Sequence, residues 1–245
     1  MQNWLKLIHR AAGHSQQQWF WFPYAGGGPA VFNPLKPYIP SSVDVYSAHL
    51  PGREGRFNEP PLSDLSLIVN NCTHAISAIA NRQIVIFGHS LGALIGYLVA
   101  ARLESSGITV SRLIVSGRHG PSVAAKTEGI SHLPDDEFLR AMAAYGGMSE
   151  EILQCPEILE MMLPMLKADF GLSEHYVTKQ QHPKVRSEMI VAGAVDDELV
   201  DFSKLERWKN FTTGPFRIVD FRGGHFYLAS QAEALVSLMH LHQPR

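Results

Sequence analysis

A serine stands between two glycines in the motif Gly88-x-Ser90-x-Gly92, and the segments on either side of it have opposite secondary-structure character. The apolar, β-branched run Gln83–Phe87 before the motif is typical of a strand, whereas the small and apolar residues of Leu91–Leu103 after it are typical of a helix. The glycines let strand and helix approach each other without Cβ clashes, and such a turn points the serine hydroxyl outward. The motif therefore predicts a nucleophile elbow.

A serine hydroxyl is a weak nucleophile at neutral pH, so a working site needs a base and a group that orients the base. In folds that carry this elbow, the partners follow in the chain order serine, acid, histidine. Asp196 follows the strand-like Glu188–Gly193, and His225 follows an apolar strand and two glycines. The carboxyl ends of parallel strands share one edge of a sheet, so we expect Ser90, Asp196 and His225 to converge there. An ordinary strand-to-helix turn is the less favoured interpretation.

The other histidines compete for the role of the base. His89 lies inside the elbow, but its adjacency to the serine points its side chain elsewhere, so we interpret it as a packing and hydrogen-bonding residue. The rest lack a Gly-Gly loop after a late strand, and surface or satisfied histidines are the simpler interpretation. No paired spacing of His, Cys or carboxylates resembles a ligand set, and we expect neither a metal nor an organic cofactor.

A candidate oxyanion loop follows the four consecutive aromatic residues Trp19–Phe22, which are compatible with a strand buried on both faces. The glycines Gly26–Gly28 let the backbone turn an N–H toward a ligand. We expect the backbone N–H groups of Ala25 and Leu91 to hold the negative charge of a tetrahedral intermediate. Phosphate binding is the weaker alternative, because the loop has neither Gly-x-Gly-x-x-Gly spacing nor a following Gly-Lys-Ser/Thr.

The order of the predicted elements indicates the fold class. Strands are expected at residues 4–8, 19–22, 43–48, 83–87, 112–116, 189–192 and 216–221, and helices at residues 62–80, 91–103, 204–210 and 231–242. This alternation predicts a mostly parallel sheet flanked by helices, and together with the elbow it indicates an α/β-hydrolase fold, as one domain over residues 1–245. It breaks at about residues 120–184, where helical patterns around Leu133–Glu137 and Glu150–His175 predict an inserted helical lid.

Composition agrees with a compact enzyme. The chain has 245 residues, of which 45% are hydrophobic, and a formal net charge of −2 with both signs well mixed. We therefore expect one large core and no nucleic-acid partner. The first residues lack the apolar core of a signal peptide, and no apolar run is long enough to span a membrane. Two cysteines cannot form a disulfide framework, so we expect a cytoplasmic protein with no membrane partner.

An ordered set of motifs over nearly the whole chain resembles the type II thioesterases, stand-alone α/β-hydrolases that accompany nonribosomal peptide and polyketide synthases. The matching segments are Phe22–Gly27, Leu50–Arg56, Phe87–Ala93, Leu163–Phe170, Trp208–Thr212 and Gly223–Phe226. The resemblance implies hydrolysis of acyl groups from the phosphopantetheine thiol of carrier domains, to edit or to release them. Such enzymes often have Asp-Pro at the acid, where this chain has Asp196-Asp197.

Other activities share this fold and these residue types. A carboxylester hydrolase, an acyltransferase, a medium-chain fatty acyl carrier thioesterase and a catalytically silent carrier-binding protein all stay open, because fold and triad fix neither leaving group nor acceptor. Arg53 and Arg56 are also open: they either meet an anionic phosphopantetheine or carrier surface, or form structural ion pairs. The sequence does not specify the acyl chain, the synthase or the oligomeric state.

Overall fold

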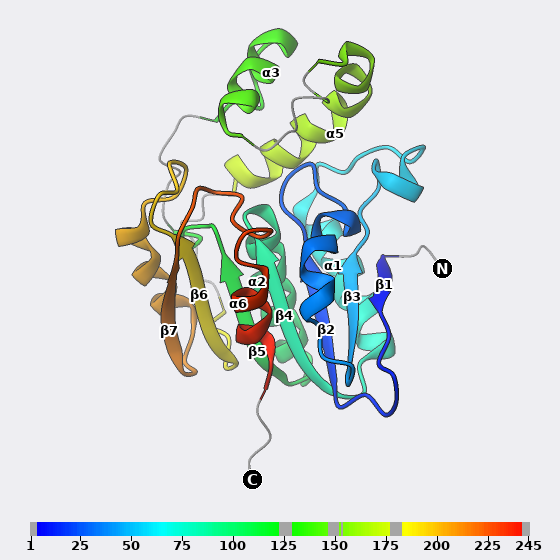
Figure 1. Cartoon of the computed structure of the whole chain (residues 1–245), viewed down its shortest axis with the longest axis vertical. Coiled ribbons are helices and arrows are strands. Elements are labelled where there is room, and N and C mark those ends of the chain that lie inside the picture. Colours follow the sequence, from blue (N-terminus) through cyan, green and yellow to red (C-terminus); the bar gives the residue numbers. More distant parts are fainter. Residues whose placement is uncertain (1–3, 123–128, 147–151, 153, 177–182, 242–245) are drawn as a thin grey trace.

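The computed structural model describes residues 4–122, 129–146, 152, 154–176 and 183–241, and within them one sheet has the strand order β1-β3-β2-β4-β5-β6-β7. The strands are β1 (Leu5–His9), β2 (Gln17–Phe22), β3 (Val43–Ala48), β4 (Gln83–His89), β5 (Val110–Ser116), β6 (Glu188–Ala194) and β7 (Phe216–Phe221). Strand β1 pairs antiparallel with β3, and the other neighbours are parallel (Figure 1). This confirms the predicted α/β fold and its mostly parallel sheet.

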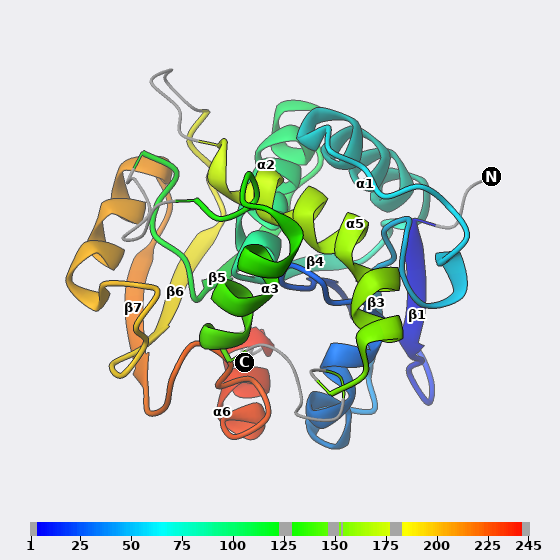
Figure 2. The ribbon, with the colours of Figure 1, turned by 90° about the horizontal axis from the view of Figure 1, so that it is seen from above.

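Helices cover both faces of the sheet. The covering elements are α1 (Leu65–Ile79), α2 (Leu91–Ser105) and α6 (Ala232–Met239), with the 3-10 helices η1 (Pro29–Tyr38) and η3 (Phe202–Phe211). The short 3-10 helix η2 (Glu54–Arg56) lies in the connection between β3 and α1. Figure 2 shows α1 and α2 on one face and α6 on the other, where α6 packs beside η1. The helix predicted at residues 204–210 corresponds to η3, which is a 3-10 helix. Helix α1 begins later than predicted, because Asp64 caps it by accepting a hydrogen bond from the Leu67 N–H at 3.1 Å.

The aromatic strand β2 joins the two hydrophobic cores. All of Trp19–Phe22 are fully buried, as the sequence predicts for a strand covered on both faces. Trp19 and Trp21 pack in the core beneath η1 and α6, whereas Phe20 and Phe22 pack in the core beneath α1 and α2. This alternation follows from the two-residue period of a strand. The cores hold the end of β2, and hence the start of the glycine loop, at a fixed place.

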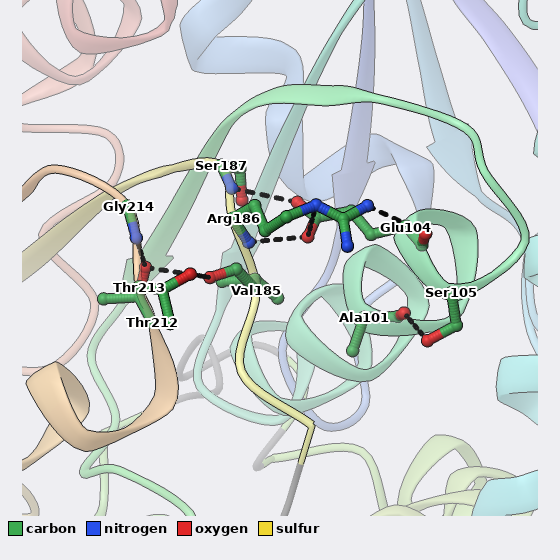
Figure 3. A network of polar contacts seen from close by, with 9 residues as sticks. All are labelled: Ala101, Glu104, Ser105, Val185, Arg186, Ser187, Thr212, Thr213 and Gly214. Carbon is green, nitrogen blue, oxygen red and sulfur yellow. Dashed lines mark hydrogen bonds and ion pairs between the residues drawn. The ribbon is translucent and has the colours of Figure 1, made fainter.

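A polar network ties the C-terminal end of α2 to the segment that leads into β6, at the amino end of that strand (Figure 3). The buried carboxylate of Glu104 accepts hydrogen bonds from the backbone N–H groups of Arg186 (2.6 Å) and Ser187 (2.9 Å). The Arg186 side chain donates to the backbone carbonyl of Glu104 at 3.0 Å. Helix α2 begins at the predicted elbow and β6 leads to the paired aspartates, so this network fixes two segments that carry site residues.

The chain between β5 and β6 forms two helices, α3 (Asp135–Ala144) and α5 (Pro156–Glu174), which lie beyond one end of the strands and cross over the sheet (Figures 1 and 2). Residues 150, 151 and 153 of the second predicted helical pattern lie outside the described residues. The two helices share a small hydrophobic cluster of their own, made of Ile130, Phe138, Met142, Met165 and Leu166. Among the described helices, none combines the length and apolar character needed to cross a membrane.

Candidate active site

Ser90 occupies a strained backbone position between β4 and α2. Its φ of 54° and ψ of −116° lie outside the regions that non-glycine residues ordinarily adopt. A Cβ at Gly88 would collide with the backbone of Gly92, and a Cβ at Gly92 would collide with the carbonyl of Phe22. The close approach of strand, helix and glycine loop therefore requires both glycines. The predicted strand, sharp turn and helix around Ser90 are confirmed.

Ser90 and His225 line one cavity at the carboxyl end of the sheet. Ala25 of the glycine loop lines the same cavity, and the inserted helix α5 contributes Phe170 and Ser173. The structure thus brings together the predicted nucleophile, the predicted base and the predicted oxyanion loop, which are far apart in the sequence. Apolar side chains form much of the remaining wall, namely Tyr145, Leu199, Val200 and Phe226.

The imidazole of His225 is oriented by a buried carboxylate. Its Nδ1 lies 2.8 Å from Oδ2 of Asp197, whose side chain is 1% exposed. The other carboxylate oxygen accepts from the N–H groups of Leu199 (2.8 Å) and Val200 (3.1 Å), so the acid is held on both sides. A carboxylate only accepts, so this pairing places the proton of the neutral ring on Nδ1 and leaves Nε2 unprotonated. That tautomer suits His225 to take a proton from a nucleophile.

The structure corrects the expectation for Asp196. Its carboxylate is exposed and accepts from the Gly223 N–H at 3.3 Å, and the residue that contacts His225 is Asp197. The reason is the turn after β6, in which the Asp197 N–H bonds back to the carbonyl of Ala194 at 3.3 Å. This bend turns the second carboxylate inward and the first outward. Either aspartate has backbone N–H groups two and three residues further on, so no sequence signal separates them.

The two residues predicted to form the oxyanion hole lie in neighbouring segments: Ala25 lines the cavity, and Leu91 begins α2 directly after Ser90. The Gly27 N–H bonds to the carbonyl of Tyr24 at 2.9 Å and Gly26 has a φ of 78°, which together define a tight turn with Ala25 at its first corner. Leu91 is the first residue of α2, so its N–H has no acceptor within the helix. The contact between Gly92 and the end of β2 keeps these two segments adjacent.

His89 is fully buried behind His225. Its Nδ1 lies 2.8 Å from Oγ of Ser116, which lies 2.6 Å from the hydroxyl of Tyr227. The ring centroids of His89 and His225 are 5.1 Å apart. Burial, followed by the proximity of His225, lowers the pKa of His89 well below its usual range. His89 is therefore a neutral ring that packs and hydrogen-bonds, in agreement with its interpretation from the sequence.

Acidification is expected to destabilise the fold through such histidines. Burial lowers the pKa of His49, His89 and His119, so the unfolded chain takes up protons below about pH 6.5 that the folded protein does not. Above that pH these histidines leave the free energy of unfolding unchanged. Below it the free energy of unfolding falls as the pH drops, by up to about 1.4 kcal/mol per pH unit for a fully buried ring. Urea unfolding between about pH 7.5 and 5.5 measures this slope. We expect a shallower slope in His89→Asn, and an unchanged slope would contradict the assignment.

Both arginines left open by the sequence form ion pairs. Arg53 contacts Asp169 on α5 at 2.7 Å, and Arg56 contacts Glu59 at 2.6 Å. Arg56 also donates to the carbonyl of His49 at 2.6 Å. Both arginine side chains are buried, so the structural alternative is the one that the structure supports.

Sequence reasoning missed a basic side chain in the cavity. Arg118, which follows β5, lines the cavity and donates to the hydroxyl of Ser173 (2.6 Å) and to the carbonyl of the same residue (2.9 Å). Burial lowers the pKa of Arg118 to about 10. Ser173 lies in the last turn of α5, where a cation interacts favourably with the helix dipole. Arg118 thereby joins the sheet edge to the inserted helices.

Known proteins share both the sequence and the fold. The thioesterase domain family model matches residues 17–242. Thioesterase PikA5 of Streptomyces venezuelae is 31% identical and covers 93% of this chain and 81% of its own length. The type II thioesterase BorB from the borrelidin biosynthetic cluster is 28% identical in its solved structure, with a TM-score of 0.85 over 97% of this chain and 95% of that chain.

One further relative is named as a dehydrogenase rather than as a thioesterase. The linear gramicidin dehydrogenase LgrE of Brevibacillus parabrevis is 33% identical over 97% of this chain and 91% of its own length. The glycine loop of the present chain, Gly26–Gly28, lacks the Gly-x-Gly-x-x-Gly spacing of dinucleotide-binding loops. The similarity to this relative therefore adds no dehydrogenase chemistry to the site.

Proposed function

This chain belongs to the thioesterase domain family and hydrolyses thioesters, and we propose that its substrates are acyl groups on the phosphopantetheine arm of carrier domains. In this role it edits or releases acyl groups in nonribosomal peptide or polyketide biosynthesis. The observation that carries the proposal is an elbow serine in one cavity with a histidine whose ring is oriented by a buried carboxylate. Similarity to thioesterases of such pathways supports the substrate class.

The proposed mechanism assigns one role to each residue. Ser90 attacks the thioester carbonyl while His225 takes its proton at Nε2, and Asp197 holds the imidazole and stabilises its positive charge. The N–H groups of Ala25 and Leu91 stabilise the oxyanion. The tetrahedral intermediate then expels the pantetheine thiolate, which receives the proton from His225. Water activated by the same histidine hydrolyses the acyl-serine and releases the acid.

We also propose that the segment at about residues 120–184 is a lid on a single α/β-hydrolase domain. Its helix α5 contributes Phe170, Ser173 and Glu174 to the cavity that contains Ser90, so an acyl chain bound at the serine would lie against it.

We propose a cytoplasmic location for the protein. Both cysteines are free thiols, which supports a place in the reducing cytoplasm.

Substrate preference is the test of the proposed function. Turnover of an acyl-carrier protein, the matching acyl-CoA and the matching oxygen ester is measured at equal acyl chain. We expect kcat/KM for the carrier to exceed that for the ester by at least about tenfold, because carrier contacts add binding energy that the ester lacks. Ser90→Ala serves as the blank for background hydrolysis.

The same comparison separates the alternatives. A carboxylester hydrolase would prefer the ester, and an acyltransferase would show turnover that depends on an added acceptor. A medium-chain fatty acyl carrier thioesterase would be active on the carrier but would prefer medium chains when the acyl length is varied. A silent carrier-binding protein would turn over none of the three substrates. The family membership favours none of these alternatives.

A further inference from the structure

Two side chains from other parts of the chain hydrogen-bond to the turn that contains the Ala25 N–H. Oδ2 of Asp169 accepts a hydrogen bond from the Gly26 N–H at 2.8 Å, and Nη1 of Arg53 donates to the Gly27 carbonyl at 3.1 Å. The turn also closes on itself through the bond from the Gly27 N–H to the Tyr24 carbonyl. These hydrogen bonds together hold the short segment from Tyr24 to Gly27.

The two side chains that contact the turn, Arg53 and Asp169, also bind each other. Arg53 and Asp169 form a two-pronged ion pair, with Nη1 to Oδ2 at 2.7 Å and Nη2 to Oδ1 at 2.9 Å. The side chains are only 5% and 1% exposed. A buried charge is tolerated when its hydrogen-bonding capacity is filled, and here the carboxylate uses both oxygens and the guanidinium also donates from Nε to the Pro51 carbonyl at 3.3 Å.

The partners come from different parts of the fold. Arg53 lies in the loop between β3 and α1, whereas Asp169 lies in the C-terminal half of α5. One turn earlier on the same helix, Leu166 fills the space beside Gly26 where a side chain at that position would stand. The backbone of the turn is therefore shaped against α5 by one polar and one apolar contact.

We propose that Asp169 and Arg53 are positioning residues that fix the oxyanion turn, so that the seating of α5 sets the direction of the Ala25 N–H. This inference rests on the proposed function of that N–H. A backbone N–H stabilises an oxyanion only when it points at the oxygen from hydrogen-bonding distance, so a small displacement of the N–H removes much of its effect. The charge balance serves the same end, because an unpaired carboxylate next to the turn would repel the developing oxyanion and Arg53 neutralises it.

The expected signature is kinetic. The oxyanion contact strengthens in the transition state, so its loss lowers kcat and leaves KM nearly unchanged. A pair that served stability alone would reduce the amount of folded protein but leave kcat per folded molecule unchanged. The distinction requires activity to be normalised to folded protein, measured by circular dichroism and thermal unfolding.

The experiment compares Asp169→Ala and Asp169→Asn with a matched control on the inserted helices. Lys167 of α5 pairs with Asp135 of α3, away from the turn, so Asp135→Asn breaks a salt bridge of these helices without touching Gly26. We expect kcat of Asp169→Ala to fall by about 10- to 100-fold with KM within about threefold. Asp169→Asn keeps an oxygen for the Gly26 N–H and should lose less, and the control should stay within about twofold.

Binding of a trifluoromethyl ketone supplies a second readout. Ser90 adds to this ketone and forms a tetrahedral oxyanion, so its inhibition constant should rise in parallel with the loss of kcat. The proposal is overturned if folded Asp169→Ala keeps kcat and inhibitor affinity within about threefold, or if Asp135→Asn loses as much. If Asp169→Ala does not fold, the double variant Arg53→Met/Asp169→Leu is judged by the same limits, because it removes both contacts to the turn without leaving a buried charge unpaired.

The assay also separates this proposal from the proposed function. Hydrolysis of a p-nitrophenyl ester is followed beside the thioester, because it requires the oxyanion turn but no carrier. If wild type prefers the ester over the carrier, the substrate class fails and the comparison of variants still stands on the ester. If wild type turns over the carrier and Asp169→Ala does so equally well, the positioning role alone fails.

Discussion

Replacing Ser90 with alanine is expected to lower turnover of the acyl-carrier substrate by about 10⁶-fold, the effect known for removal of a triad serine. The hydroxyl is the atom that bonds to the acyl carbon, and the members of a triad act as a unit, so the other two cannot compensate. Folding should be retained, because Ser90 belongs to neither hydrophobic core. Turnover under steady-state conditions and labelling by a fluorophosphonate probe measure the loss.

Ser105→Ala is the matched control for this variant. Ser105 lies at the far end of the same helix α2, where its hydroxyl donates to the Ala101 carbonyl at 2.8 Å. Its replacement should leave turnover and labelling unchanged. Turnover above about 1% of wild type in a folded Ser90→Ala protein would refute the mechanism.

Asp197→Asn is expected to cost about 10⁴-fold in turnover, whereas Asp196→Asn should stay within about twofold of wild type. An amide at residue 197 that keeps accepting from Leu199 and Val200 turns its NH₂ toward Nδ1 of His225, which favours the wrong ring tautomer and removes the charge that stabilises the imidazolium. An amide at residue 196 still offers an oxygen to the Gly223 N–H.

The pair of variants is its own control, since the substitutions are chemically identical and adjacent. Steady-state kinetics on one acyl thioester, with thermal unfolding to confirm the fold, compares them directly. A larger loss in Asp196→Asn than in Asp197→Asn would return the role of the acid to Asp196 and would mean that the turn after β6 rearranges when substrate binds.

The elbow and the strands could be predicted because their signals are local. The close approach of strand and helix at Ser90 requires a glycine two residues away on either side, and both glycines are visible in the sequence. The run Trp19–Phe22 can bury its aromatic surface only in a strand that is covered on both faces. The chain order of serine, acid and histidine then placed Ser90 and His225 at one sheet edge. Their meeting in one cavity follows from the parallel sheet.

The choice between the two aspartates could not be predicted, because it depends on how one short turn bends after β6. In the structure this turn closes through a bond from the Asp197 N–H to the Ala194 carbonyl, and the Asp197 carboxylate faces His225. The ion pair of Arg53 with Asp169 is beyond sequence reasoning for another reason. Its partners are separated by 116 residues, and nothing near either one signals the other.

The inserted helices have a hydrophobic cluster separate from the two cores that hold the sheet. The C-terminal half of α5 is also tied to the sheet, because Leu172 belongs to the core beneath α1 and α2 and Asp169 pairs with Arg53. We therefore expect substitutions within the separate cluster to loosen the inserted helices locally while the sheet and the tied half of α5 stay folded. Side chains can thus vary within this cluster without moving the elbow, where the close backbone contacts at Gly88 and Gly92 leave no room for a side chain.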